Sequence, residues 1–505
     1  MLDAGLELEP ERQAVVHQLA NQEPGDWAPA SVAKLKENYQ ASAAGIPLKY
    51  SYGSDFPYRE TDRYLPSDAT NIGLVPSLAK GGFSSVWGAA VLPYLASEFG
   101  EWPIRYEDLA PHYRSVLAFT GLAATSDDLE TLFPLHSDTA VSLRPSRQAE
   151  TFLADLANNR ERLRARGIRF GKSRLAGFAN GRSSPSCKSC GLCMYGCPYG
   201  LIYNTSSTLE ELTQEPGFTY RGGLIVERFS EIGGGVKITA KSRADGRQIS
   251  FEGSRLYVAA GVLSSTKMLL DSVEAHDQEL TVKDSQYFLL PLLRYRRVAG
   301  ACEESLHTLA QAFVEILDEN LSPNSIHLQV YSYNELYRQA IQGSLGRLYR
   351  PLKLASDRFL ERLLLIQGYV HSDLSATISL RIKKPQHGAP SKMVLTGNVN
   401  PATRHILKKT ARKLFGCRSL FKAVPLTPLM KIGQPGRGFH SGGTLPMRAR
   451  PGQFETDSLG RPSGFKRVHI VDSSVFPTIN ASTITLTVMA NAHRIASLHD
   501  AGDAN

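Results

Sequence analysis

The most informative part of the sequence reads His440-Ser441-Gly442-Gly443-Thr444-Leu445-Pro446-Met447 and later Val468-His469-Ile470-Val471-Asp472-Ser473-Ser474-Val475-Phe476-Pro477. The pattern predicts a strand at 468–472 and, beyond the proline-containing turn, a helix at 485–497. A strand that ends in Asp-Ser-Ser and turns into a helix directs several backbone N–H groups toward one point. Such a point suits an anion or the polar edge of a ring, so the segment predicts a nucleotide site.

The order His-x-x-Gly-Thr-x-x-Met, Val-x-Asp-x-Ser-x-x-Pro and an Ala-rich helix resembles the C-terminal signature of glucose–methanol–choline (GMC) flavoenzymes. In that family the histidine takes the proton of the substrate hydroxyl while hydride passes to the flavin. The resemblance implies that His440 is the general base, a role that suits the near-neutral pKa of imidazole. It also implies bound FAD and oxidation of a CH–OH group in an alcohol, sugar or sterol-like substrate.

One position departs from the family pattern. GMC enzymes usually carry His or Asn eleven residues after the signature aspartate, and that position is Thr483 here. A threonine hydroxyl can hydrogen-bond flavin or substrate, but it cannot act as a base at neutral pH. We therefore expect Thr483 in the catalytic site as a hydrogen-bonding group, with Asn480 or Ser482 as alternatives.

Other segments resemble the parts of GMC enzymes that hold FAD. Glycines near 81–88 would let the backbone approach the cofactor closely, and the run 255–261 reads as a buried parallel strand closed by small residues. The resemblance implies a set of cofactor-binding residues, namely Asp3, Gly81, Gly82, Ser84, Ser85, Trp87, Gly88, Val226, Ala260, Gly261, Asp472, Ser473 and Thr483.

Asp3 matches the acidic residue that binds the ribose at the end of the second Rossmann strand. The Gly-x-Gly-x-x-Gly fingerprint would then lie roughly 20 residues earlier, before Met1. We accordingly expect an N-terminally incomplete Rossmann-like lobe that binds FAD poorly. The alternative function is a truncated or non-catalytic GMC homologue that serves as a metal-binding or partner subunit.

Four of the six cysteines lie in one loop, at 187, 190, 193 and 197, within the segment 183–206. The spacing Cys187-x2-Cys190-x2-Cys193-x3-Cys197-Pro matches the bacterial ferredoxin run. It predicts an iron–sulfur cluster, of the 3Fe-4S or 4Fe-4S type, with Cys302 or Cys417 as further candidate ligands. A structural zinc site and a loop of reduced thiols are the alternatives. A cluster would pass electrons to an acceptor protein or a quinone.

The expected fold class is α/β, with a Rossmann-like FAD lobe and a substrate lobe built on an antiparallel sheet. We place the first part of the FAD lobe at 1–284, the substrate lobe at 285–400 and the C-terminal part of the FAD lobe at 401–505. Residues 106–121 read as an amphipathic helix, and strands are expected at 224–230, 236–241 and 248–251 as a meander. In the substrate lobe, 306–317 and 354–366 read as helical.

Composition is that of an ordinary soluble protein, with 42% hydrophobic and 21% charged residues. No signal peptide or membrane span is recognised, so a cytoplasmic location is expected. The net charge of +9 favours anionic partners, although no nucleic-acid motif is present. Basic clusters (Arg294, Arg296, Arg297, Lys383, Lys384) and Tyr331, Tyr333 and Tyr337 suit a sugar or phosphorylated sugar, or only a solvated face. The basic, leucine-rich stretch 347–366 could lie on a membrane; packing on its own lobe is favoured.

Overall fold

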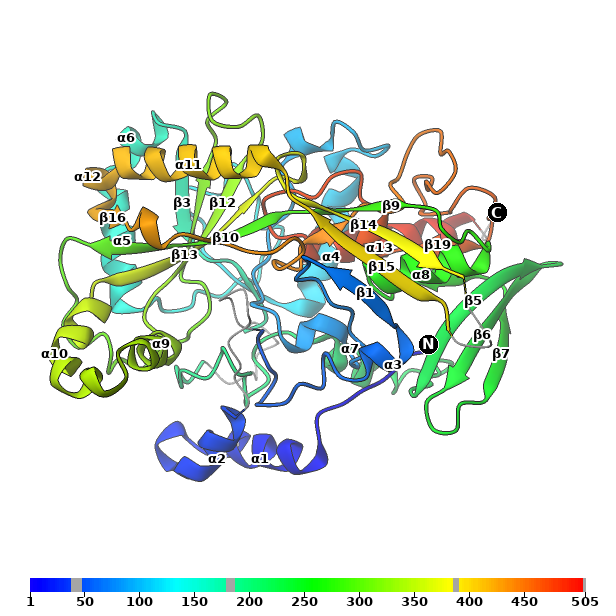
Figure 1. Cartoon of the computed structure of the whole chain (residues 1–505), viewed down its shortest axis with the longest axis horizontal. Coiled ribbons are helices and arrows are strands. Elements are labelled where there is room, and N and C mark those ends of the chain that lie inside the picture. Colours follow the sequence, from blue (N-terminus) through cyan, green and yellow to red (C-terminus); the bar gives the residue numbers. More distant parts are fainter. Residues whose placement is uncertain (38–47, 179–186, 385–389, 503–505) are drawn as a thin grey trace.

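The structure is a computed structural model that describes residues 1–37, 48–178, 187–384 and 390–502. Figure 1 shows an elongated molecule in which one large sheet lies at the left and a second sheet, with the C-terminal helix α13 (Thr485–Gly502) behind it, lies at the right. The described segments contain no helix that is both long and apolar enough to cross a membrane.

The larger sheet is antiparallel and runs in the order β16-β10-β13-β12-β11-β3, with β17 also paired to β10. Its centre is buried on both faces, because every residue of β11 and β12 is buried. Strands from before, within and after 285–400 contribute: β3 (Ile168–Lys172), β10 (Gln286–Arg294), β11 (Ala312–Ile316), β12 (Ile326–Tyr331), β13 (Leu363–Val370), β16 (Ala423–Pro425) and β17 (Lys431–Ile432).

Helices cover this sheet and share one apolar core with it. Phe152 and Leu156 of α5 pack in the same core as Leu407 and Leu414 of α11, although the two helices are far apart in the sequence. Figure 1 shows α11 lying across the top of the sheet. The helices that supply this layer are α5 (Arg147–Ala157), α6 (Arg160–Arg164), α11 (Pro401–Gly416) and α12 (Arg418–Phe421).

The second sheet has five strands in the order β1-β15-β14-β9-β18. Only its β1–β15 pair is parallel, and the other pairs are antiparallel. The short strand β18 ends this sheet and begins directly after His440, so the sheet edge positions the candidate base. The strands are β1 (Ser67–Thr70), β9 (Leu280–Asp284), β14 (Thr377–Lys383), β15 (Lys392–Asn398) and β18 (Ser441–Gly442).

A parallel pair, β8 (Leu256–Val258) with β19 (Val468–Ile470), joins the two sequence segments that resemble FAD-binding elements. Gly261, with φ of 83°, turns the chain from β8 into α8 (Val262–Ser272). The predicted parallel strand is therefore present, but it is less buried than expected, because Tyr257 is 41% exposed. The predicted meander is also present, as β5 (Leu224–Ile232), β6 (Gly235–Ser242) and β7 (Gln248–Gly253).

The remaining elements frame this region. Helix α4 (Tyr106–Thr120), expected at 106–121, packs through Leu109 and Tyr113 into the same core as α13. At the N-terminus, Leu2 forms a parallel bridge with Arg221, and Leu6 forms one with Ala79. The other elements are α1 (Pro10–Ala20), α2 (Pro29–Leu35), α3 (Thr61–Tyr64), β2 (Leu122–Ala123), β4 (Leu175–Ala176), α7 (Thr205–Leu212), α9 (Glu335–Leu345) and α10 (Tyr349–Leu360).

Two helix expectations were wrong. The segment 306–317 holds the strand β11, because a segment buried on both faces has no amphipathic period by which strand and helix could be told apart. Within 354–366, α10 ends at Leu360 and the strand β13 begins at Leu363. The division of the chain at residues 284 and 400 stays a prediction.

Candidate active site

A cavity of about 350 Å³ lies between the large sheet and the loops that precede β18. Strands β12 and β13 supply Gln329, Tyr331, Gln367 and Tyr369 from adjacent positions, since Gln329 pairs directly with Gln367. Its other walls include Lys49, Tyr58, Phe83, Ser84, Trp87, Gly88, Met194, Tyr287, Arg437, Phe439, His440 and Thr483.

His440 lies in this cavity with its imidazole stacked on the ring of Tyr369, with ring centroids 4.5 Å apart and planes 18° apart. Its Nδ1 is enclosed and finds no hydrogen-bond partner among the described residues. Burial, with a smaller contribution from His327, lowers the pKa of His440 to about 3. The imidazole is therefore neutral at physiological pH, which is the form that can accept a proton.

The backbone around His440 is held by Asp284 at the end of β9. Ser285 N–H donates to the His440 carbonyl at 2.9 Å. The Asp284 carboxyl accepts from Gly436 N at 2.8 Å and from Ser441 Oγ at 2.9 Å. Burial raises the pKa of Asp284 to about 7. These contacts bracket the loop on both sides of His440 and fix where its side chain begins.

A buried pair of residues, His327 and Glu315, also contacts Tyr369. The rings of His327 and Tyr369 stack with centroids 6.2 Å apart, and His327 Nδ1 is hydrogen-bonded to Glu315. Both residues are fully buried, and burial raises the pKa of Glu315. Tyr369 therefore stacks with both histidines, and sequence patterns alone do not indicate these ring contacts.

Thr483 lines the cavity, and its Oγ1 accepts a hydrogen bond from Leu92 N at 2.8 Å. Of the alternatives, Asn480 donates its side-chain amide to Glu98, and burial raises the pKa of Glu98 to about 7. Ser482 Oγ is enclosed without a hydrogen-bond partner in the described part of the chain. Neither Asn480 nor Ser482 lines the cavity, so Thr483 is the one of the three that is placed beside His440.

The glycine-rich loop contributes Ser84, Trp87 and Gly88 to the cavity. Gly81, with φ of 80°, packs at the start of α7, where a Cβ would lie 2.8 Å from Asn204 Oδ1. Ser84 Oγ donates to the Gly81 carbonyl at 2.6 Å. Gly81, Gly82 and Ser85 do not line the cavity, whereas Ser84, Trp87 and Gly88 do.

Lys49 was not anticipated from the sequence. Its Nζ donates to the Trp87 carbonyl at 2.8 Å, and burial lowers its pKa to about 8. The other lining residues that sequence reasoning missed are Tyr58, Tyr287, Gln329, Gln367 and Tyr369, and Tyr331 alone was named for the substrate side. The paired Gln329 and Gln367, polar positions within apolar strands, are the one sequence signal that could have found them.

The Asp472 group lies outside this cavity. Asp472 accepts from Gly261 N at 2.9 Å and from Ser474 N at 2.9 Å, while Ala260 N donates to Ser265 Oγ at 3.1 Å. Ser473 Oγ donates to the Ser441 carbonyl at 2.7 Å, which links this group to the His440 loop. The carboxylate thus stabilises the turn into α8 and the turn after β19.

Two further predicted cofactor-binding residues, Asp3 and Val226, lie at a third place, apart from the cavity and from Asp472. The Leu224 N–H donates to the Asp3 carbonyl at 2.9 Å, so Asp3 lies beside the first residue of β5, and Val226 follows two positions on. The Asp3 carboxylate accepts from Tyr220 Oη at 3.0 Å, and burial raises its pKa. The predicted cofactor residues therefore fall at three sites, of which only the first surrounds His440.

The cysteine loop lies next to the cavity, where Met194 is one of the lining residues. Cys193 is buried, and its Sγ accepts from Thr308 N at 3.5 Å. Among the described residues, which include all six cysteines but not 183–186 of the loop, no group of three or more His, Cys, Asp or Glu side chains could hold a metal ion. The described residues therefore give no support to an iron–sulfur or zinc centre at this loop.

Comparison with known proteins supports the reading of the C-terminal segment. Residues 427–492 match the family model of GMC oxidoreductase. This range contains His440, Asp472 and Thr483 and covers a minor part of the chain. No curated protein matches the sequence.

Two solved structures share the fold. Pyridoxine 4-oxidase from Mesorbium loti is 14% identical with a TM-score of 0.56, over 99% of this chain and 93% of that chain. An FAD-dependent oxidoreductase from Chaetomium thermophilum is 11% identical with a TM-score of 0.57, over 100% of this chain and 99% of that chain. The predicted fold class, α/β with an antiparallel-sheet lobe, is confirmed.

Proposed function

We propose that this chain is an FAD-dependent oxidoreductase of the GMC type that oxidises a CH–OH group. The observation that carries the proposal is the placement of His440, neutral and with its Nδ1 enclosed, in a cavity together with Ser84, Trp87, Gly88 and Thr483. Residues from two distant parts of the sequence that independently resemble GMC elements meet at this one place. The match of residues 427–492 to the GMC oxidoreductase model supports the same conclusion.

The cavity fits the ring portion of a flavin. Gly88 lets the wall approach closely, because a Cβ there would meet only Tyr331 Oη, at 3.6 Å. Ser84 and Thr483 supply short polar groups on a wall that is otherwise aromatic and aliphatic, as is usual for cofactor sites. When bound, FAD would supply the hydride acceptor. Asp3, Val226, Gly261, Asp472 and Ser473 remain proposed contacts for the rest of the cofactor.

In this proposal His440 receives the hydroxyl proton of the substrate on a ring nitrogen. Tyr369 holds the imidazole plane by stacking, and the Asp284 contacts hold the backbone of the loop. Thr483 Oγ1 retains a donor hydrogen after accepting from Leu92 N, and that hydrogen is available to a substrate or cofactor oxygen.

The lining favours an alcohol with an aromatic or apolar body. Tyr58, Tyr287, Tyr331, Tyr369 and Phe83 present ring surfaces. The basic clusters at 294–297 and 383–384 do not line the cavity, and Arg294 is paired with Asp155. The earlier interpretation of those clusters as a sugar-phosphate site therefore has no support in the geometry. Electrons would leave to oxygen or to a protein or quinone acceptor, and an iron–sulfur relay is not part of the proposal.

An anaerobic titration distinguishes the enzyme from the alternative of a non-catalytic homologue. The chain is loaded with FAD and mixed with aromatic primary alcohols, long aliphatic alcohols and free sugars. The proposal expects the flavin absorbance to bleach with the aromatic or aliphatic alcohols and to respond weakly to sugars. Flavin that binds but stays oxidised with every alcohol would favour the non-catalytic homologue.

A further inference from the structure

The connection between β12 and β13 is a helical hairpin formed by α9 and α10, which projects at the lower left of Figure 1. We define residues 335–360 as the hairpin. It is anchored at its base, because Leu360 packs with Cys302 and Tyr333, and Leu336 packs against the core that contains Leu192. Its far end is exposed, so the expectation that the stretch 347–366 packs on its own lobe holds only for the part near β13.

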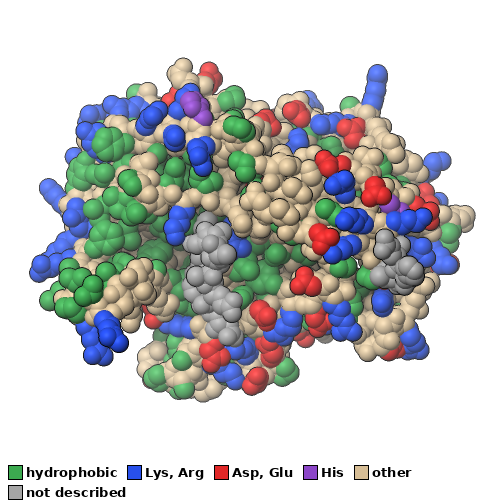
Figure 2. Space-filling model, in the orientation of Figure 1, with side chains coloured by type: hydrophobic (Ala, Val, Ile, Leu, Met, Phe, Trp, Pro, Cys, Tyr) green, Lys and Arg blue, Asp and Glu red, His purple; other side chains and the backbone are tan. Residues whose placement is uncertain are grey.

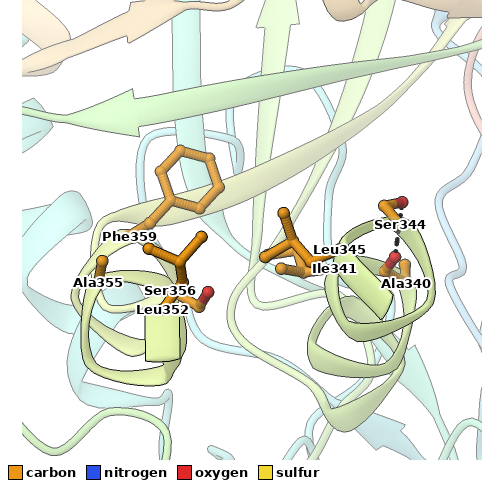
Figure 3. Close-up of a pocket in the computed structure, with 8 residues that line it drawn as sticks. All are labelled: Ala340, Ile341, Ser344, Leu345, Leu352, Ala355, Ser356 and Phe359. Carbon is orange, nitrogen blue, oxygen red and sulfur yellow. Dashed lines mark hydrogen bonds between the residues drawn. The ribbon is translucent and has the colours of Figure 1, made fainter. Parts of the chain in front are cut away.

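The exposed end of the hairpin carries leucines that nothing in the described chain covers. Leu354 is 76% exposed, Leu348 63% and Leu352 43%. Between the helices lies an open apolar groove of about 460 Å³. Figure 3 shows Leu352 and Phe359 of α10 facing Ile341 and Leu345 of α9 across this groove. An apolar groove with exposed leucines at the same end of the hairpin is typical of an interaction site.

Basic side chains surround these leucines. Arg347, Arg350, Lys353 and Arg358 are exposed and make no ion pair with any described residue. Arg350 and Arg358 lie one helical turn before and after Leu354, so these two cations share the face of α10 that carries Leu354, whereas Leu352 lines the groove. Figure 2 shows hydrophobic side chains beside Lys and Arg at the position of this hairpin, at the lower left.

The acidic residues of the hairpin are already paired. Glu335 is bonded to Lys36, and Asp357 lies 3.2 Å from Arg338. Just beyond the hairpin, Glu361 lies 3.3 Å from Arg297. The uncompensated charge at the exposed end is therefore positive, and it is contributed by the four basic residues next to the leucines.

We propose that the hairpin docks this protein onto an anionic membrane surface. Exposed leucines enter the boundary between headgroups and acyl chains, while the long basic side chains at the same end of the hairpin reach the phosphates. A second copy of the chain is disfavoured as the occupant, because a two-fold contact would bring the same four cations against one another. The inference stands on the hairpin alone and does not require the proposed function.

The first test is co-sedimentation of the full chain with vesicles of phosphatidylcholine, with and without phosphatidylserine. The protein is expected to bind the phosphatidylserine vesicles, to bind phosphatidylcholine vesicles weakly, and to be released at about 0.5 M salt, where surface charge is screened. Failure to bind phosphatidylserine vesicles at low salt would overturn the proposal. In that case the same groove is left to an acidic protein partner.

Variants assign binding to the hairpin. Replacing Leu348 and Leu354 with Asp, or Arg350 and Lys353 with Glu, changes only exposed side chains and is expected to leave the melting temperature unchanged. Each cation near an anionic surface contributes about fivefold to partitioning, so reversing two should weaken binding by more than about 25-fold. Two matched controls are Val399→Asp, at a site 71% exposed, and Lys408→Glu with Lys409→Glu on α11. Equal loss in hairpin and control variants would mean that net charge, not the hairpin, drives binding, and would also overturn the proposal.

Discussion

The imidazole of His440 lies flat against the phenol ring of Tyr369, with ring centroids 4.5 Å apart and an interplanar angle of 18°. The ring of His327 also stacks on Tyr369, with ring centroids 6.2 Å apart, and it is hydrogen-bonded to Glu315. The orientation of the candidate base is therefore set by an aromatic stack rooted in the large sheet. The first prediction concerns this stack.

Tyr369→Ala is expected to cost about 3–5 kcal/mol of unfolding free energy, because a buried aromatic ring is deleted, and to slow flavin reduction because His440 loses its support. Tyr369→Phe keeps the ring and should stay close to the wild type in both. Chemical denaturation and stopped-flow absorbance measure the two effects. If Tyr369→Phe were as slow as Tyr369→Ala, the hydroxyl and not the stacking would be the important group.

Thr483→Val tests the hydroxyl that accepts from Leu92 N. Removal leaves a buried N–H unpaired, and we expect a loss of about 1–3 kcal/mol in unfolding free energy. Thr483→Ser restores the acceptor and should recover most of that loss. A valine variant as stable as the wild type would show that Leu92 N finds another acceptor and that the hydroxyl has no structural role.

Asp284 predicts a pH dependence of stability. Burial raises the pKa of this carboxyl from its ordinary value of 3.8 to about 7, so the native state binds this proton more tightly than the unfolded state. Its contribution to stability is present below about pH 4 and is lost as pH rises through about 7. Relative to Asp284→Asn, which cannot titrate, the wild type should lose melting temperature between pH 4 and 8. A constant difference between the two proteins over that range would contradict the assignment.

The cysteine loop yields a compositional prediction. Because the described thiols do not converge into a ligand set, the purified chain should contain well under one iron per molecule. The double variant with Cys190→Ser and Cys193→Ser should then keep its flavin and its reduction rate. Iron and sulfide assays decide the point: stoichiometric iron that disappears in the double variant would restore the iron–sulfur centre.

The sequence was sufficient to predict those helices and strands that turn residues and apolar periodicity mark within the element itself. The strand and helix on either side of Asp472, the meander and α4 were all anticipated, since turn residues and periodic apolar positions mark them in the sequence. The strand β11 was mistaken for a helix because Ala312–Ile316 is buried on every side and lacks a period. Which strands pair in each sheet could not be predicted from local patterns either. Strands β3 and β16, for example, join a sheet whose other strands are far away in the sequence.

The residues of the candidate site also divide into those that the sequence could predict and those that it could not. His440 and Thr483 could be named because a signature carries them, and the structure places both in one cavity. Lys49, Gln367 and Tyr369 could not, because their role depends on long-range packing that no spacing in the sequence encodes. The ferredoxin-like cysteine spacing is the opposite case, a strong local pattern for which the described residues show no group of side chains able to hold a metal ion.

The most direct test of the central claim is the anaerobic rate of flavin reduction in FAD-loaded wild type and in His440→Ala, measured with the best alcohol substrate. The account predicts equal flavin content in the two proteins and a rate lower by about 10²–10⁴-fold in the variant, the usual contribution of a general base. An unchanged rate with full flavin occupancy would remove His440 from the reaction and contradict the account.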